Sequence, residues 1–435
     1  CNDDRLYWIC VYIKVEFAIF MGAWYIRLNK NNTRVVTMYE NSKRAGKLSF
    51  MLTGIGMAPW AAIMPYVKDR LALDEIYYAQ LLLSFGIGAV IGMPLAWIIC
   101  KRFGVKNVIV LALFLLFLTV LAISSPSIAY VPAIVAVTLW GFLIGILEVA
   151  NNIYGTFFED LTKQHLLSGF QAYSTIGCIF SAIIYPVLLP FNLSPFRVSI
   201  LITVPCLLLI LFCHKYLINT HGQRSDDKSK STISTDNTVV CFQENFTKFH
   251  IVMAGIACLL MFLCEGMIYD WSGVYLNAKC NVSLEIAAIG YAIFQLAVAI
   301  MRLLGDRLVS KIGGTKLLCT GSIIAFITLQ FIAFHHEAVV VITSFAIAGL
   351  ALGNVVPVII STVAKNCGKN KSAAISTVGT IGYSGVLIGP ALLGLLADKF
   401  GLEMIFSFVG VLTLVMCALC WYILSANSKR MVTDN

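Results

Sequence analysis

The stretch Glu265-Gly-Met-Ile-Tyr-Asp-Trp-Ser-Gly-Val-Tyr-Leu276 follows directly on the apolar run Ile251–Cys264. Together they exceed the roughly 20 apolar residues that a helix needs to cross a bilayer. Two carboxylates, Glu265 and Asp270, interrupt the segment. A charged side chain in the hydrocarbon core costs at least about 2.5 kcal/mol, and such residues usually mark a solute or ion pathway. The stretch therefore predicts a membrane helix whose acids have a function.

The composition extends this prediction to the whole chain. Of its 435 residues, 59% are hydrophobic and 12% are charged, which is about half the charged fraction of an ordinary soluble protein. The net charge of +9 does not predict a nucleic-acid partner, because the basic residues lie in short loops between apolar runs. The 14 cysteines are scattered and show no disulfide or metal-ligand spacing. We expect no metal and no cofactor.

Apolar runs of spanning length recur along the chain and predict an all-α integral membrane protein with 12 transmembrane helices. The expected segments are about 47–67, 76–100, 107–125, 130–156, 167–190, 196–217, 249–276, 285–305, 316–334, 338–364, 372–397 and 402–425.

The same pattern divides the chain into domains. We expect an N-terminal extension over 1–45, in which Met38 resembles a natural start and 1–37 is dispensable. Residues 46–217 and 249–426 form six-helix halves, 218–248 is a polar linker, and 427–435 is a tail. Most loop Lys and Arg residues lie on the side of the linker and the tail, so both termini are expected in the cytoplasm.

The two halves repeat each other weakly. Ser174-Thr-Ile-Gly177 recurs as Gly379-Thr-Ile-Gly382, and Arg102-Phe-Gly104 recurs as Lys311-Ile-Gly313. Parallel repeats of this kind predict a binding site at their interface near the middle of the membrane.

These motifs resemble the major facilitator superfamily. Asp306-Arg-Leu-Val-Ser-Lys-Ile-Gly-Gly314 resembles its basic loop between helices, and Gly394-Leu-Leu-Ala-Asp-Lys-Phe-Gly401 fits its GxLADxxG pattern. Within the superfamily the chain looks like the bacterial YbjJ-like group, distantly related to fucose permease, on motifs that include Glu265-Gly…Asp270-Trp-Ser. The resemblance implies two parallel six-helix repeats, a bacterial inner membrane and a monomer. It departs from the family at Lys101, where an Asp is usual.

Three acids are candidates for proton coupling. Glu148 shares one face of its helix with Gly141, Gly145 and Asn152, and the resemblance implies that an acid here takes part in proton coupling. The alternative is a neutral Glu that bonds two helices. Glu265 and Asp270 are five residues apart, about 140° around a helix. We expect one of them to face the central cavity and the other to tie its helix to a neighbour; both assignments stay open, and we favour Glu265 for the cavity and Asp270 for the tie.

Other polar residues lie at depths compatible with a substrate site. Each is equally compatible with a helix–helix hydrogen bond, and Trp271 with an interface anchor. The candidates are Asn151, Asn152, Gln171, Tyr173, Trp271, Tyr291, Gln295 and Asn354.

A separate set of charged residues predicts gating. Arg302 and Asp306 are spaced i, i+4, which predicts a local ion pair that acts as a latch. Lys101, Arg102 and Arg307 lie in the loops beside the expected latch.

The predicted function is secondary active transport of a small solute by alternating access, coupled to protons. Sugar-like uptake and export of drugs or metabolites both remain open. A receptor or assembly protein on the same scaffold is the alternative, and a membrane enzyme is a weaker one. No nucleotide-binding motif predicts an ATPase, and the chain is not expected to be an enzyme.

Overall fold

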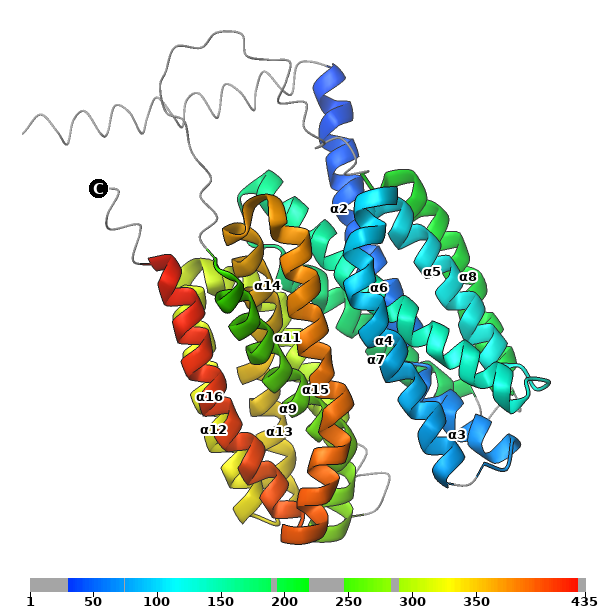
Figure 1. The fold of residues 1–435 in the computed structure, drawn as a ribbon, viewed down its shortest axis with the longest axis vertical. Coiled ribbons are helices and arrows are strands. Elements are labelled where there is room, and N and C mark those ends of the chain that lie inside the picture. Colours follow the sequence, from blue (N-terminus) through cyan, green and yellow to red (C-terminus); the bar gives the residue numbers. More distant parts are fainter. Residues whose placement is uncertain (1–29, 74, 189–193, 219–245, 283–288, 429–435) are drawn as a thin grey trace, which may run out of the picture.

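The structure is a computed structural model that describes residues 30–73, 75–188, 194–218, 246–282 and 289–428 (Figure 1). Over these residues the chain is helical and contains no strand. Most of the polar linker, the C-terminal residues 429–435 and most of the dispensable stretch proposed upstream of Met38 lie outside the described residues.

The described residues of the first half of the chain, here called the N half, form seven helices. These are α2 (Lys30–Met57), α3 (Trp60–Arg70), α4 (Glu75–Phe103), α5 (Val105–Ser124), α6 (Tyr130–Thr162), α7 (Leu167–Leu188) and α8 (Pro195–Tyr216). Together α2 and α3 make the first spanning segment.

The second half, the C half, repeats this arrangement. Its helices are α9 (Lys248–Cys280), α11 (Ile289–Ile312), α12 (Gly314–Phe334), α13 (Ala338–Leu352), α14 (Val355–Asn366), α15 (Lys371–Phe400) and α16 (Leu402–Ser428), with a short 3-10 turn η3 (Gly368–Asn370). Since α13 and α14 form one segment, each half contributes six spanning segments, and the predicted fold class is confirmed. Eight of the described helices or helix pairs are long and apolar enough to cross a membrane by themselves.

Single glycines join three pairs of antiparallel helices. Gly104 lies between α4 and α5, Gly313 between α11 and α12, and Gly401 between α15 and α16, with φ of +84°, +83° and +89°. Side-chain-bearing residues rarely adopt this backbone conformation, so glycine is needed for so short a connection. Gly104 and Gly313 are also the equivalent positions of the sequence repeat.

Two predicted segments are broken, and one begins early. The first breaks between Met57 and Trp60, where Pro59 lacks the N–H that a continuous helix would use. The tenth breaks between Leu352 and Val355. Helix α2 begins at Lys30, well before the expected 47, because a helix can continue beyond the bilayer where hydropathy gives no signal. Ser42 is buried, and its hydroxyl donates to the carbonyl oxygen of Tyr216.

Within each half, glycines allow close helix packing. A Cβ at Gly88 of α4 would lie 2.1 Å from the Thr138 carbonyl oxygen of α6, and one at Gly141 would lie 2.0 Å from that of Phe85. Gly54 of α2 and Gly177 of α7 likewise lie so close to backbone oxygens of the facing helix that a Cβ would not fit. Small residues let membrane helices approach this closely, so Gly141 serves helix packing.

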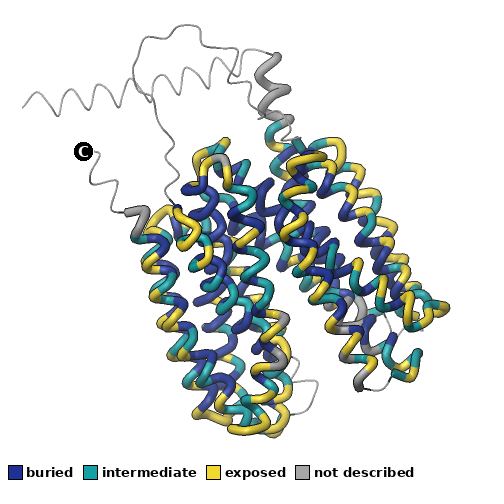
Figure 2. Tube along the Cα trace, viewed as in Figure 1, coloured by how far each residue is buried: buried dark blue, intermediate teal, exposed yellow. Residues whose placement is uncertain are grey.

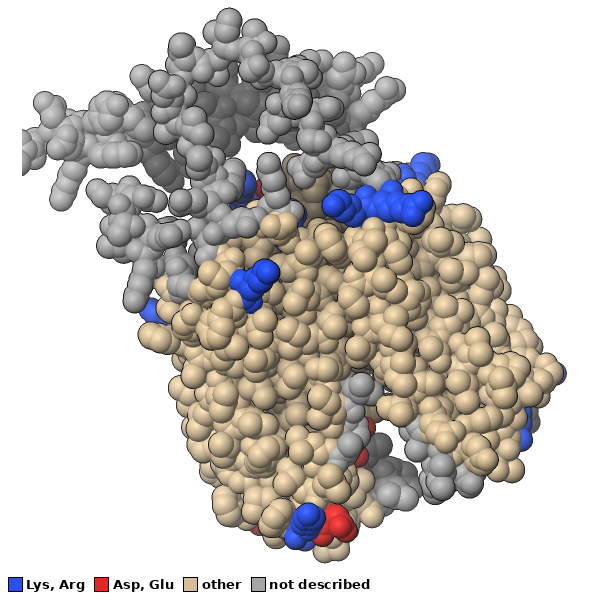
Figure 3. All heavy atoms as spheres, in the orientation of Figure 1, with Lys and Arg blue, Asp and Glu red and all other residues tan. Residues whose placement is uncertain are grey.

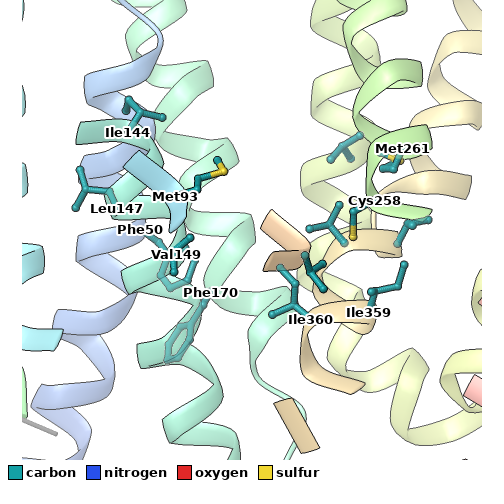
Figure 4. Close-up of a cluster of buried hydrophobic side chains, with 14 of the residues drawn as sticks. Phe50, Met93, Ile144, Leu147, Val149, Phe170, Cys258, Met261, Ile359 and Ile360 are labelled. Atoms are coloured by element: carbon teal, nitrogen blue, oxygen red, sulfur yellow. The ribbon is translucent and has the colours of Figure 1, made fainter. Parts of the chain in front are cut away.

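The two halves lie side by side and meet through α4 with α15 and α7 with α11 (Figure 1). Exposed apolar residues cover the outer faces of the helices, and buried ones fill each half (Figure 2). Figure 4 shows buried side chains in both halves, with Phe50 and Phe170 in one and Met261 and Ile359 in the other. We call the end where α8 ends and α9 begins the linker end, and the opposite end the open end.

Candidate functional site

Glu148 lies near the middle of α6, 14 residues before its last residue, Thr162, or about 21 Å along the helix. Its side chain is half-buried between buried neighbours. The Tyr383 hydroxyl of α15 is its hydrogen-bonding neighbour, and Arg302 and Glu265 lie within electrostatic range. All three belong to the C half, so Glu148 faces the other half of the molecule.

Glu265 lies at a similar depth, 17 residues after the first residue of α9, Lys248. Gln295 Nε2 donates to its Oε1 over 2.9 Å and also to the Tyr291 hydroxyl over 2.8 Å. The Tyr291 ring packs edge-on against Tyr269, with centroids 4.8 Å apart. Three of the predicted residues, Glu265, Tyr291 and Gln295, therefore meet at one place.

These groups converge on the interface between the halves. Cys178 of α7 lies within electrostatic range of Glu148, Glu265 and Arg302. In Figure 3 the surface between the two halves is hollowed toward the open end, with acidic atoms visible inside. The arrangement places two carboxylates and two phenols together at the interface between the halves.

Asp270 and Trp271 lie closer to the open end of α9. Asp270 was the acid expected to tie its helix to a neighbour; its side chain is exposed, and the part of the chain that the structure describes offers it no hydrogen bond or ion pair. Five residues of helix turn it about 140° away from Glu265. Trp271 packs beside Gly394 of α15, and its buried indole N–H has no partner among the described residues.

The amides of α6 and α7 are used inside the N half. Asn151 accepts from the Ser49 hydroxyl over 2.8 Å and donates to the Thr53 hydroxyl over 2.9 Å. Gln171 donates to Asn152 Oδ1 over 2.9 Å. All three amide side chains are buried. They join α2, α6 and α7 to one another. This is the helix–helix hydrogen bonding that the sequence left open as the alternative to substrate binding.

Arg302 connects the halves without pairing with Asp306, so the predicted local ion pair is wrong. Its Nη1 donates to Thr175 Oγ1 of α7 over 2.6 Å, and its Nε donates to the Gly353 carbonyl oxygen over 3.1 Å. The break between α13 and α14 leaves that carbonyl available. At the same break, buried Asn354 donates to the Met301 carbonyl oxygen.

Asp306 instead contacts the N-terminus of α7 in the N half. Its carboxylate accepts from Ser168 N over 3.2 Å and from Gly169 N over 2.9 Å. The first N–H groups of a helix have no partner within the helix and favour a negative charge. A Cβ at Gly169 would lie 2.7 Å from Asp306 Oδ2, so glycine makes room for this contact.

Further contacts close the linker end between the halves. Lys371 of α15 pairs with Asp160 of α6. Ser361 of α14 donates to buried Glu159, which also accepts from Leu166 N over 2.8 Å and Leu167 N over 3.1 Å.

A histidine and a lysine meet in the same region. Lys365 Nζ lies 3.1 Å from His165 Nδ1 in the loop before α7. Burial and the charge of Lys365 lower the pKa of His165, while Glu159 opposes this shift. A neutral imidazole can accept from the ammonium group, whereas a protonated one repels it.

The remaining gating candidates lie apart from these contacts. Lys101, Arg102 and Arg307 are exposed, and the described inter-half hydrogen bonds and ion pairs do not include them. Lys101 and Arg102 lie over the rings of Trp97 and Phe103 of their own helix.

One cation lies beside a predicted substrate residue. Lys47 Nζ of α2 is 5.0 Å from the ring centroid of Tyr173, which is half-buried.

Tyr383 and Glu159 are the important residues that sequence reasoning missed. Tyr383 directly follows the repeated motif Gly379-Thr-Ile-Gly382, but only the folded chain places it against Glu148. Glu159, near the end of a spanning helix, could have been found as an acid next to an apolar run.

The comparisons with known proteins agree with this fold. The family model "Major Facilitator Superfamily" matches residues 48–373 and 281–434. An uncharacterised MFS-type transporter of Yersinia pestis is 31% identical over 376 residues, covering 86% of this chain and 93% of its own. The membrane protein MosC of Rhizobium meliloti is 25% identical, with 85% and 87% covered.

Solved structures share the fold at low identity. FucP in the outward conformation superposes with a TM-score of 0.68 at 18% identity, covering 87% of this chain and 98% of its own. The proton:xylose symporter XylE gives 0.66 at 16%, with 89% and 96% covered. The relative of 31% identity, the family model that matches residues 48–373 and 281–434, and this arrangement of helices agree with one another. The chain belongs to the major facilitator superfamily and is a multi-pass membrane transporter.

Proposed function

We propose that this protein is a proton-coupled secondary transporter that moves a small solute by rocking its two halves around the site between Glu148 and Glu265. The observation that carries the proposal is the position of these two acids, half-buried, at mid-helix, on facing halves. Acids inside a membrane usually mark such pathways. Two proteins of the same fold, a fucose:proton symporter and a proton:xylose symporter, support protons as the coupling ion.

The proposed orientation places the linker end in the cytoplasm of a bacterial cell, with the protein acting as a monomer in the inner membrane. Lys and Arg cluster at the linker end in Figure 3, and cytoplasmic loops carry an excess of these residues. The contacts of Asp306, Glu159 and Lys371 close that end. In this orientation the structure corresponds to an outward-facing state.

The proposed cycle uses the inter-half contacts as a gate. Contacts between Asp306 and the α7 N-terminus, and between Arg302 and Thr175, cross the interface and must break when the linker end opens. The contact of Arg302 with Gly353 stays within the C half and can persist. Gain or loss of a proton at Glu148 or Glu265 changes the charge of the site, and a bound solute is expected to bias the gate through that charge.

The test is solute-driven proton movement in proteoliposomes containing the full chain and an internal pH dye. A panel of sugars (fucose and xylose included), amino acids and amines is added outside without an imposed gradient. At least one class is expected to change the internal pH, and Glu148→Gln is expected to abolish the change. If no solute moves protons or itself crosses the membrane, while binding is detected, a receptor is the better assignment.

A further inference from the structure

We propose that the solute carried between Glu148 and Glu265 is a small organic cation with an ammonium group. This inference rests on the proposed transport function and names the chemical class of its substrate. Some polar groups of the site are already hydrogen-bonded, and the groups that remain free define the solute.

The guanidinium in electrostatic range of Glu148 already makes two hydrogen bonds. Arg302 donates through Nη1 to Thr175 and through Nε to the Gly353 carbonyl oxygen. Both contacts hold the guanidinium in the wall of the site at the linker end, where it serves the gate. A carboxylate or phosphate on the solute would therefore meet two acids, and the other described cation of this region, Lys47, lies over the Tyr173 ring.

Most of the neutral donors nearby are occupied as well. Asn151, Asn152 and Gln171 are buried and bonded inside the N half. Gln295 uses its Nε2 on Glu265 and Tyr291. Two described donors remain for a sugar, the unpartnered Trp271 indole N–H and the Tyr291 hydroxyl, which accepts from Gln295 and can still donate. They are fewer than the acceptor positions of the two carboxylates. Recognition of a polyol generally needs donors as well as acceptors.

The free capacity of the site is for accepting hydrogen bonds. A carboxylate has two oxygens and about four lone-pair positions. Tyr383 is a hydrogen-bonding neighbour of Glu148, and Gln295 donates one bond to Glu265 Oε1, so each carboxylate has further acceptor positions. An ammonium group supplies three donors and a positive charge, so it matches both the hydrogen bonding and the charge that remain.

Aromatic rings beside both acids are an independent observation for the same ligand. The rings of Tyr383 and Phe262 lie 4.7 Å apart beside Glu148, and those of Tyr291 and Tyr269 lie 4.8 Å apart beside Glu265. Faces of such rings attract organic cations. At Gly266, next to Glu265, a Cβ would meet nothing within 4 Å. Carboxylates, ring faces and open space together form a site for an amine.

A cation also fits the coupling chemistry. When the ammonium group binds, its charge can take the place of a proton on Glu148 or Glu265, and the proton leaves to water. Binding of one then disfavours binding of the other, which is the requirement for exchange of solute against protons.

The test compares ligands that differ in charge but little in shape. The purified full chain is incubated with choline or its neutral carbon analogue 3,3-dimethylbutan-1-ol, benzylamine or benzyl alcohol, and cyclohexylamine or cyclohexanol, with fucose, xylose and benzoate added separately. Thermal stabilisation measures binding, because a ligand of the native state raises its unfolding temperature. One or more amines should stabilise the protein while its neutral partner does not.

Variants assign the effect to the site. Glu148→Gln and Glu265→Gln should each weaken binding of the stabilising amine at least about tenfold, as expected when a charged partner is removed. The control Glu337→Gln removes an exposed acid before α13 and should leave binding unchanged. Loss of folding is recognised from the unfolding temperature without ligand, and Glu148→Asp should then restore part of the binding.

Several outcomes overturn the inference. They are binding of fucose, xylose or benzoate in preference to every amine, equal binding of amine and neutral partner, no binding of any amine, or amine binding that survives both Gln substitutions. The proposed function fails separately. Proton-coupled flux of a neutral solute would support the transport function and contradict a cationic substrate. Amine binding without flux would support the amine site and contradict the transport function.

Discussion

Asp306→Asn should open the linker end. In the structure the Asp306 carboxylate accepts two backbone N–H groups at the N-terminus of α7, at 3.2 and 2.9 Å. Asparagine has nearly the same shape but carries no charge and only one acceptor oxygen. The substitution therefore removes part of a contact that crosses the two halves and leaves the fold of each half intact.

The size of the effect follows from the bonds lost. A hydrogen bond to a charged group contributes about 1.5–3 kcal/mol, and a charge at a helix N-terminus adds about 0.3–1 kcal/mol. Because one oxygen remains and the site is partly exposed, we expect a net loss of about 1–2 kcal/mol. That corresponds to roughly a 5- to 30-fold rise in the ratio of linker-open to linker-closed molecules.

Distance measurements between spin labels on the two halves test this directly. Labels introduced through unnatural amino acids at the exposed residues Lys163 and Lys311 report on the linker end. Asp306→Asn should increase the long-distance population. Gly169→Ala should act in the same direction, since its Cβ would lie 2.7 Å from Asp306 Oδ2.

The matched control is Asp398→Asn, which changes an exposed acid at the other end of the molecule. It should leave the distances unchanged. If Asp306→Asn and Gly169→Ala also leave them unchanged in folded protein, the contact does not hold the linker end closed.

Three further predictions concern packing, the buried amides and pH. Gly88→Ala should lower the unfolding temperature by an overpacking cost of about 1–3 kcal/mol, because its Cβ would lie 2.1 Å from a carbonyl oxygen, whereas Gly266→Ala meets nothing and should not. Asn151→Ala should cost about 1–3 kcal/mol of stability by thermal unfolding while leaving solute affinity unchanged; a large loss of affinity at unchanged stability would contradict its structural role. His165 has a lowered pKa when the linker end is closed, so closure favours its neutral form. That preference is lost as pH falls below the ordinary value of about 6.5, and the spin-label distances should then lengthen in wild type but not in His165→Gln.

The amino-acid sequence was sufficient to predict the fold. Apolar runs of spanning length and the repeated Thr-Ile-Gly motif predict two parallel sets of six segments, because the bilayer requires continuous apolar helices. Helix breaks were missed, since a run such as 338–364 stays apolar across Gly353 and hydropathy does not report backbone geometry.

The candidate site was predicted only in part. Glu148, Glu265 and Gln295 could be found because a polar group in an apolar helix is conspicuous. Whether such a group faces the other half or bonds within its own depends on helix rotation, so Asn151 could not be assigned from spacing alone. Contacts between residues far apart in sequence, such as Glu148 with Tyr383 and Arg302 with Thr175, arise only from the packing of the two halves.

The most direct test of proton-coupled transport compares two modes of flux in the same proteoliposomes. Once a transported solute is identified, wild type and Glu148→Gln are assayed for gradient-driven flux and for exchange of labelled against unlabelled solute. We predict that Glu148→Gln loses flux driven by a pH gradient and keeps exchange, because exchange requires the rocking of the halves but no net proton movement. Undiminished pH-driven flux in Glu148→Gln would contradict the role of this acid in coupling.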